Sequence, residues 1–380
     1  MIYEQKSHAA KNAYGITLRP EILYQMHGET SVDEKRQIRS RFAIDHALGG
    51  RGRVHSRWHD PYIVDEVDPD MYRPFRVNRA HLESYLAHGL DIRYGYQYTS
   101  DLAAKHKIIV AADGVHSSIR KQYLPQDQPE IHPIVAIRGK RRMSKQQFLE
   151  LQSSNSEGIV AYEDYQHESA DENNAAAHGI VTRIAIAEVT ESDDQLALEW
   201  VYSRPAHGSD DALYKPNRSN DEANHIDESF YDELAQLRQH QLKSNEVPEL
   251  WAEIFDVEKV RDDHKLSWLM RSVHPQHDLA SHQSGSQEVF FIGDAIHAQP
   301  IIGGQGANQA MQDGLMLASS IHQEGFGGLQ GLYSQVVQRW VRSTYASKRR
   351  LLAMHQLADT PLAATEGVIE QAGKSTSPRL

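Results

Sequence analysis

The chain has 380 residues, a formal net charge of −12 and no cysteine. The negative charge argues against a nucleic-acid-binding surface, and the absence of cysteine excludes disulfides and thiolate chemistry. No apolar stretch approaches the roughly 20 residues of a membrane-spanning helix, and no secretory signal pattern is visible. We therefore expect a cytoplasmic protein with one large or two ordinary domains, no transmembrane segment and no nucleic-acid partner.

Two short apolar runs each end in an acidic residue beside a glycine. Ile108 to Val110 predict a buried strand, which Asp113 and Gly114 follow. Phe290 to Ile292 predict a second strand, followed at once by Gly293 and Asp294. Each predicted strand therefore delivers an aspartate at its C-terminal end.

Between these runs the sequence predicts a largely antiparallel sheet. Short runs without helices between most of them are typical of such a sheet; they are Pro133–Arg138, Gly158–Tyr162, Arg183–Val189 and Leu196–Tyr202. The polar segment from Ser203 to Glu228 predicts surface loops. Helical patterns return at Phe230 to Leu242 and Pro248 to Phe255.

A glycine-rich turn after Asp294 opens a predicted helix. An apolar stripe of helical period follows Gly306; it consists of Ala307, Ala310, Met311, Gly314, Leu317, Ala318 and Ile321. The helix start brings free N–H groups and a partial positive charge close to Asp294. A flavin suits both groups, because its ribityl hydroxyl needs an acceptor and its ring gains negative charge on reduction. An ordinary strand–loop–helix connection would use the same glycines for the turn.

The last periodic segment, Leu329 to Leu357, predicts an amphipathic helix packed on the body of the protein. We favour this interpretation over a membrane-surface role because the apolar stripe is of ordinary width. The 22 histidines show no metal-binding spacing, so we expect no metal site and interpret them as solvated. His297 has either a structural role in its loop or a role in proton transfer.

Three motifs in one order resemble those of the FAD-dependent aromatic hydroxylases with the p-hydroxybenzoate-hydroxylase fold. Two are the aspartates after the apolar runs, at Asp113 and Asp294. The third is the segment from Phe75 to Leu82, with Leu86 one turn on, which looks like the family's Arg-x-x-Leu-x-x-x-Leu helix start. The resemblance implies an α/β fold, in which a discontinuous FAD/NAD(P)-binding Rossmann-like domain holds an inserted, mainly antiparallel substrate domain and is followed by C-terminal helices. We assign 1–125 and 265–325 to the FAD-binding domain, 126–264 to the substrate domain, and 326–380 to a C-terminal helix and tail.

The resemblance also implies an activity. Reduced nicotinamide, NAD(P)H, would pass hydride to FAD, and O2 would supply the oxygen atom that hydroxylates or epoxidises a small organic substrate, aromatic or a secondary metabolite. Arg79 and Asp294 would hold the cofactor, Leu18 would approach it through its backbone, and Glu4 would bind the adenosine ribose. The N–H groups of Gly306, Ala307 and Asn308 would stabilise charge on the reduced ring. The family has no single transferable catalytic base, so no catalytic residue is named.

The resemblance is incomplete in two places. Relatives begin with a strand and a Gly-x-Gly-x-x-Gly turn that approaches the pyrophosphate, whereas this sequence opens at what looks like their second strand. The run before Lys107 is also shorter than usual. Gly49-Gly50-Arg51-Gly52 follows no apolar strand and predicts a surface turn instead. We expect weak FAD binding or none, and unpaired strand edges at Ile2-Tyr3 and at Ile108 to Val110. The alternative function is a truncated, non-catalytic paralogue that keeps the fold without FAD chemistry.

Overall fold

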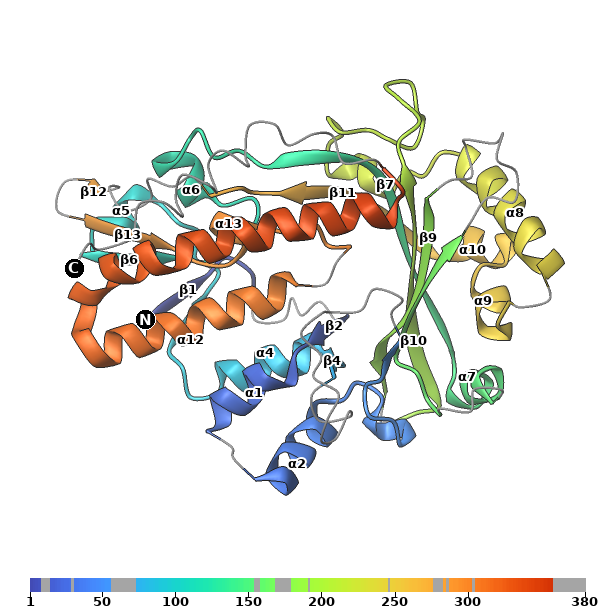
Figure 1. Ribbon diagram of the computed structural model, residues 1–380, viewed down its shortest axis with the longest axis horizontal. Coiled ribbons are helices and arrows are strands. Elements are labelled where there is room, and N and C mark those ends of the chain that lie inside the picture. Colours follow the sequence, from blue (N-terminus) through green and yellow to red (C-terminus); the bar gives the residue numbers. More distant parts are fainter. Residues whose placement is uncertain are drawn as a thin grey trace, which may run out of the picture.

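The computed structural model describes most of the chain, namely residues 1–7, 14–28, 31–55, 73–153, 158–167, 179–190, 192–244, 247–275, 283–284, 287–302 and 305–357. Figure 1 shows a sheet of long strands at one end and two long helices, α12 (Gly306–Glu324) and α13 (Leu329–Met354), running away from it. The predicted C-terminal helix is confirmed as α13, and α12 begins where the glycine-rich turn predicted a helix start.

Parallel strands lie at the opposite end from the large sheet. β6 (Ile108–Ala111) pairs in parallel with β13 (Gln287–Phe291), and β12 (Gln283–Ser284) pairs with β13 on its other edge. β1 (Ile2–Glu4) pairs in parallel with β5 (Ile92–Tyr94) as a separate two-stranded sheet. Both strands predicted to precede an aspartate are therefore present and are direct neighbours.

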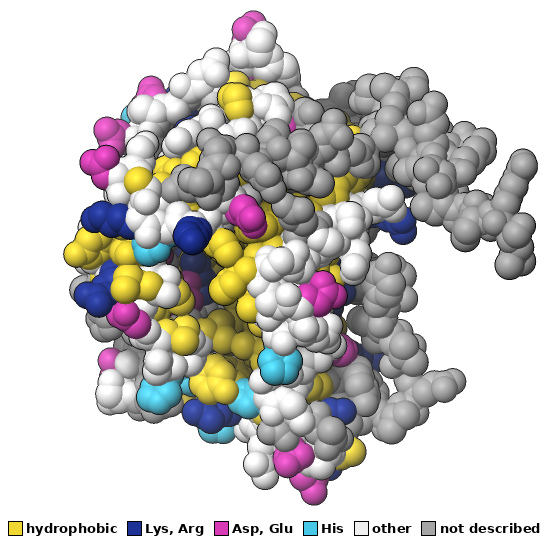
Figure 2. Space-filling model, turned by 90° about the vertical axis from the view of Figure 1, so that its left-hand side faces the viewer, with side chains coloured by type: hydrophobic (Ala, Val, Ile, Leu, Met, Phe, Trp, Pro, Cys, Tyr) yellow, Lys and Arg dark blue, Asp and Glu magenta, His cyan; other side chains and the backbone are white. Residues whose placement is uncertain are grey.

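The outer edges of β1 and β6 are open in the described part of the chain. β1 pairs only with β5, and β6 pairs only with β13. Ile2 is 46% exposed and Val110 is 39% exposed, which confirms the predicted edges. Figure 2 views the molecule from the left-hand side of Figure 1, where hydrophobic side chains surround a hollow in the surface.

A third unit is built around a short antiparallel pair. β2 (Gly15–Leu18) pairs with β4 (Phe75–Asn78), and Leu18, Phe75 and Val77 join its buried core. The helices of this region are α1 (Pro20–His27), α2 (Val32–Phe42), η1 (His46–Leu48) and α4 (Arg79–Ala87). α4 begins at Arg79, as the motif implied.

The turn at Gly49 to Gly52 is only partly the surface turn that the sequence suggested, since Gly49 and Arg51 are exposed. Gly52 is buried, and its N–H donates to Asp45 Oδ1 at 2.6 Å. Asp45 is itself fully buried, and a Cβ at Gly50 would lie 2.1 Å from its Oδ2. The glycines therefore let the backbone close around a buried carboxyl group.

The large sheet has six strands in the order β11-β7-β10-β9-β8-β3 and is antiparallel except at β3–β8. The strands are β3 (Val54–His55), β7 (Glu130–Ser144), β8 (Tyr162–His167), β9 (Ile180–Val189), β10 (Gln195–Pro205) and β11 (His264–Ser272). The predicted antiparallel sheet is confirmed, and three predicted strands fall inside β7, β9 and β10. The predicted strand at 158–162 is wrong, because β8 starts at its last residue and continues through polar side chains.

Helices cover one face of this sheet, on the right in Figure 1. They are α7 (Lys145–Gln152), α8 (Ser229–Gln241), η4 (Leu242–Ser244), α9 (Glu249–Ile254) and α10 (Val257–Asp262). α8 and α9 confirm the two predicted helices. The predicted loop region contains only the short helix η3 (Asp221–Asn224) in addition to the end of β10.

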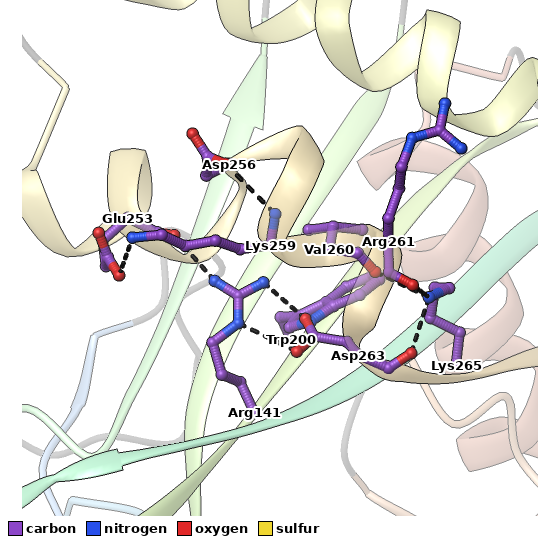
Figure 3. Close-up of polar contacts among 9 residues, drawn as sticks. All are labelled: Arg141, Trp200, Glu253, Asp256, Lys259, Val260, Arg261, Asp263 and Lys265. Carbon is purple, nitrogen blue, oxygen red and sulfur yellow. Dashed lines mark hydrogen bonds and ion pairs between the residues drawn. The ribbon is translucent and has the colours of Figure 1, made fainter.

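A buried ion pair ties this face together (Figure 3). Arg141 donates from Nε to Asp263 Oδ1 at 3.0 Å and from Nη2 to Oδ2 at 2.6 Å, and its Nη1 donates to the Glu253 carbonyl at 2.8 Å. Trp200 Nε1 also donates to Asp263 Oδ2 at 2.7 Å. Lys265 Nζ donates to three carbonyls at 2.7 Å each, those of Val260, Arg261 and Asp263. Every group here has partners, so the cluster is structural.

The opposite face of the sheet is turned toward α13 and the β2–β4 unit (Figure 1). Leu351 and Met354 of α13 pack there against Ile134 and Ala136 of β7. The remaining helices are α5 (Ser100–Ala103), α6 (Ser118–Tyr123), α11 (Asp294–His297) and η6 (Gly325–Gly328). No helix among the described residues combines the length and apolarity needed to cross a membrane. The expected fold class is confirmed; the assigned domain boundaries stay a prediction.

Candidate flavin site

Two aspartates follow neighbouring parallel strands. Val110 pairs with Phe290 and Ala111 with Phe291, so β6 and β13 end side by side. Asp113 lies just after β6, and Asp294 just after β13 at the start of α11. Gly293 between β13 and α11 has φ 58° and ψ −145°, a backbone conformation that glycine alone adopts readily.

The Asp294 carboxylate lies at the start of α12. A Cβ at Gly306 would lie 3.4 Å from Asp294 Oδ1, an ordinary contact distance, so the first residue of α12 lies close to this carboxyl group. The N-cap residue of α12, Gln305, makes no capping hydrogen bond to the helix. Because the first-turn N–H groups of a helix have no partner inside it, a hydrogen-bond acceptor and a set of donors lie side by side here.

The charge on Asp294 is held in a poorly solvated place. The residue is exposed, yet the protein atoms around its carboxyl group desolvate it and raise its pKa. His297, Arg79 and Arg120 oppose this rise in pKa through their positive charges. Titratable groups with shifted pKa values cluster at functional sites, which makes the accessible Asp294 a candidate ligand-binding residue.

Arg79 lies close enough to act on Asp294 and is held by its own surroundings. Its backbone N–H donates to the Tyr14 carbonyl at 3.0 Å, and its Nε donates to Glu83 at 2.5 Å. Its Nη1 donates to the Tyr14 hydroxyl, and the guanidinium lies 4.9 Å from the centroid of that ring. The contact of Arg79 with the cofactor stays a prediction.

Asn308 joins α12 to the end of β2. Its Oδ1 accepts from the Arg19 N–H at 2.8 Å, and its Nδ2 donates to the Thr17 carbonyl at 3.1 Å. The two bonds bracket Leu18, which is fully buried, and Ala307 packs on the same core. The sequence pointed to the backbone N–H of Asn308 and missed the role of its side chain.

Glu4 lies apart from this group. Its Oε1 accepts from the Lys6 N–H at 2.8 Å, and its carbonyl accepts from the Tyr96 N–H at 3.0 Å. Neither bond reaches Asp294 or α12, since β1 belongs to the separate sheet with β5. Its proposed contact with the adenosine ribose stays a prediction.

Asp313 of α12 was missed by the sequence reasoning. It is 3% exposed and accepts four hydrogen bonds: from the Gly293 N–H at 2.9 Å, His297 Nε2 at 2.5 Å, Trp340 Nε1 at 2.8 Å and Arg339 Nη2 at 2.6 Å. It therefore fixes the backbone that carries Asp294. The available signal was an acidic residue within the apolar stripe of a predicted helix, which demands a buried partner.

Arg120 was missed as well. It is fully buried and donates from Nη1 to the Ala295 carbonyl at 2.7 Å, from Nη2 to the Val115 carbonyl at 2.6 Å and from Nε to the Asp127 carbonyl at 3.0 Å. Burial lowers its pKa, and three aspartates oppose that shift. It joins the loops that follow the two parallel strands.

Several histidines are buried rather than solvated, which corrects the expectation. His132, His167 and His355 are hydrogen-bonded inside the protein. His297 is 1% exposed, stacks on Trp340 at 4.9 Å and leaves its Nδ1 without a hydrogen-bond partner. No cluster of three metal-ligating side chains exists among the described residues.

Comparisons with known proteins agree with this geometry. A model of the FAD binding domain matches residues 166–353. The chain is 32% identical over 310 residues to the FAD-dependent monooxygenase nscC of Arthroderma otae, covering 73% of this chain and 68% of that protein. The chain belongs to the FAD-dependent monooxygenases.

Two more similarities define the family further. The FAD-dependent monooxygenase vrtH of Penicillium aethiopicum is 30% identical over 360 residues, which cover 87% of this chain and 79% of that protein. The structure of Klebsiella pneumoniae HpxO complexed with FAD and uric acid matches with a TM-score of 0.55 and 16% identity, over 97% of this chain and 85% of that one. The latter likeness shows a shared fold.

FAD is the cofactor of this monooxygenase, and the residues at the end of β13 fit it. The accessible Asp294 carboxylate supplies an acceptor for a hydroxyl group, and the uncapped start of α12 supplies donors for a ring that gains negative charge. Gly306 lies close enough to Asp294 for one ligand to contact both.

Proposed function

We propose that this monooxygenase uses NAD(P)H and O2 to hydroxylate or epoxidise a small organic substrate with an aromatic ring. The observation that carries the proposal is the accessible, desolvated Asp294 carboxylate beside the uncapped start of α12. A hydrogen-bond acceptor and the start of a helix whose N-cap side chain makes no capping bond thus lie at one place. A cofactor that offers a hydroxyl group and an anionic ring satisfies both.

Each residue of this site has a distinct role in the proposal. Asp294 accepts a hydrogen bond from the cofactor, and Arg79 supplies a charged donor. The N–H groups of Gly306, Ala307 and Asn308 stabilise negative charge on the reduced ring. Leu18 is held by Asn308 so that its backbone lies beside the same turn. When bound, FAD accepts hydride from the nicotinamide and activates O2 for oxygen transfer.

Aromatic and cationic side chains connect this site with the large sheet. Tyr14 lies between Arg79 and Arg138, at 4.9 and 5.6 Å from its ring centroid. Arg138 also lies 5.1 Å from the ring of Trp268, which is half-buried on β11. Flat apolar surfaces edged by guanidinium groups suit an electron-rich aromatic ring, which supports the proposed substrate class.

The test is a single-turnover measurement on the FAD-loaded enzyme. We expect NADH or NADPH to bleach the flavin absorbance, and isotope-labelled O2 to place one labelled oxygen atom in an aromatic product. Asp294→Ala should lose both signals through loss of bound FAD, while Asp33→Ala, at a side chain that is 86% exposed on α2, should retain them. A FAD-loaded enzyme that neither nicotinamide reduces would refute the proposal.

A further inference from the structure

His297 is a buried histidine whose two ring nitrogens have different surroundings. Its Nε2 lies 2.5 Å from Asp313 Oδ2, and both side chains are 1% exposed. Its Nδ1 is buried and has no hydrogen-bond partner. His355, by contrast, is bound at both nitrogens by neutral groups, at 2.8 Å to the Leu351 carbonyl and at 3.0 Å to Ser203 Oγ, and burial lowers its pKa to about 4. The surroundings of His355 suit a neutral ring, whereas the Asp313 carboxylate suits a ring that carries positive charge.

The aromatic neighbour of His297 also suits a cation. The imidazole ring stacks on Trp340, with the ring centroids 4.9 Å apart and an interplanar angle of 26°. Tryptophan is the side chain whose ring face attracts cations most strongly. Trp340 is itself fixed, because its Nε1 donates to Asp313 Oδ1 at 2.8 Å. The carboxylate and the aromatic face therefore hold an imidazolium ring in one orientation.

His297 lies beside Asp294 on the same helical turn. The two residues are the first and the last of α11, three positions apart, so their side chains are neighbours. Burial of the Asp294 carboxyl group raises its pKa, and His297 opposes this rise more strongly than the other two cations, Arg79 and Arg120. Asp313 acts on Asp294 in the opposite sense, but its charge is shared among His297 and three other donors.

An ionised Asp294 is the better acceptor for a cofactor hydroxyl group. A carboxylate only accepts hydrogen bonds, whereas a protonated carboxyl group carries an O–H that needs an acceptor of its own. Hydrogen bonds to a carboxylate are also roughly twice as strong as those between neutral groups. A desolvated Asp294 therefore needs a nearby cation that does not occupy its oxygens. His297 meets this need, because its ring is buried and bound to Asp313 instead.

We propose that His297 is a positioning residue which, protonated at both ring nitrogens and held by Asp313, keeps Asp294 ionised as the acceptor for the cofactor. This inference rests on the proposed role of Asp294 in binding FAD. His297 acts through Asp294 and touches neither cofactor nor substrate. The role differs from both alternatives drawn from the sequence, which were a structural role in the loop and proton transfer.

A double-mutant cycle on the FAD-free protein tests whether His297 acts on Asp294. His297→Gln keeps a donor for Asp313 and removes the positive charge. Because the ionised Asp294 then loses its strongest cationic neighbour, Asp294→Asn should stabilise the His297→Gln protein more than it stabilises the wild type. We expect the two gains to differ at neutral pH by at least about tenfold in the unfolding equilibrium constant, which corresponds to one pKa unit.

Denaturant unfolding measures both gains. Their difference should vanish as pH falls toward 3.8, the ordinary pKa of an aspartate, because Asp294 is then protonated in the folded and unfolded states alike. His207→Gln, at an exposed histidine beyond the end of β10, is the control and should leave the gain from Asp294→Asn unchanged. Equal gains in the wild-type and His297→Gln backgrounds would overturn the inference.

Titration of FAD between about pH 6 and 9 tests the consequence for the cofactor. His297→Gln should bind FAD at least about tenfold more weakly than the wild type at the acid end and approach wild-type affinity at the alkaline end, where Asp294 ionises without help. A structural role alone would weaken binding equally at every pH. That result, or unchanged affinity throughout, would also overturn the inference.

Circular dichroism establishes that each variant is folded, and His297→Asn replaces His297→Gln in both measurements if the latter is not. Because the unfolding cycle uses neither FAD nor a nicotinamide, it separates this inference from the proposed function. A FAD-loaded enzyme that NAD(P)H fails to reduce, with unequal gains in the cycle, would refute the proposed function alone.

Discussion

The two parallel strands β6 and β13 end in the same sequence signature and use it differently. Asp113 after β6 accepts from the Ser118 N–H at 2.9 Å, the Ser118 hydroxyl at 3.3 Å and the Ile119 N–H at 3.4 Å, at the start of α6. Asp294 after β13 faces the start of α12, whose cap residue makes no such bond. The Asp113 carboxylate is hydrogen-bonded to the start of the helix that follows it, whereas the Asp294 carboxylate remains accessible.

The difference lies in which residue stabilises each turn. At the end of β6 the aspartate itself provides the local hydrogen bonding. At the end of β13 the local hydrogen bonds are provided instead by Asp313 of α12, which accepts from the Gly293 N–H and from His297. Because Asp313 fixes the turn, the Asp294 carboxylate is not needed for that purpose. We therefore propose that, of the two aspartates, Asp294 binds the cofactor and Asp113 stabilises its helix.

Removing Asp313 should have the largest effect. Asp313→Ala strips the carboxylate from four donors, two of them on the buried side chains His297 and Trp340. Breaking such a buried charged cluster costs about 3–5 kcal/mol of unfolding free energy. Denaturant unfolding measures the loss, with exposed Asp33→Ala as the control, expected within about 0.5 kcal/mol of wild type. A change equally small for Asp313→Ala would show that the turn does not depend on it.

Asn308 allows its side chain and its backbone to be separated. Asn308→Ala should cost about 1–3 kcal/mol, because it leaves the Arg19 N–H and the Thr17 carbonyl without their partner. Asn308→Pro removes the same side chain and also the N–H, which has no intrahelical bond in the first turn. We expect only the proline variant to accumulate less anionic reduced flavin in stopped-flow reduction. Equal impairment of the two variants would contradict a role of the Asn308 backbone N–H in stabilising the reduced flavin.

Asp113→Ala should have a smaller effect, on stability alone. It removes a cap from α6, which typically contributes about 1 kcal/mol of unfolding free energy. Thermal unfolding of the Asp113→Ala and wild-type proteins measures it. An unchanged melting temperature would mean that the hydrogen bonds to Asp113 do not stabilise α6.

The smallest effect concerns pH. Surroundings that desolvate Asp294 raise its pKa above the ordinary value of 3.8, so the folded FAD-free protein binds this proton more tightly than the unfolded chain does. The ionised carboxylate therefore opposes folding at neutral pH, and this cost fades as pH falls through the raised pKa toward 3.8. Asp294→Asn should be the more stable protein at neutral pH and lose its advantage in acid. If the stability advantage of Asp294→Asn grew on acidification, the predicted sign of the pH effect would be wrong.

Much of this fold follows from local patterns in the sequence. Alternating and apolar runs located β9, β10 and β13, and the stripe after Gly306 located α12, because each buries one face against a core. The sequence did not predict β8, because this strand carries the polar residues Glu163, Asp164 and Gln166. Its extended form depends on pairing with its neighbours in the sheet.

The site could be predicted only for those residues that lie within one short segment of the sequence. Asp294, Gly306 and Asn308 lie within a single stretch of chain, and their order signals a strand, a turn and a helix. Asp313 draws Trp340 and Arg339 from α13, and Arg76 meets Tyr162 across two sheets. Such partners are far apart in the sequence and meet only in the folded protein, so no local sequence pattern predicts their contacts.

The central claim, that the two strand-end aspartates have different duties, is tested most directly by titrating FAD into the wild type, Asp294→Ala and Asp113→Ala. Loss of a charge-assisted bond of about 1.5–3 kcal/mol predicts that Asp294→Ala binds FAD about 10–100 times more weakly. Asp113→Ala should bind within about threefold of wild type, because its carboxylate serves α6. Equal losses in the two variants, or a larger loss for Asp113→Ala, would contradict the account.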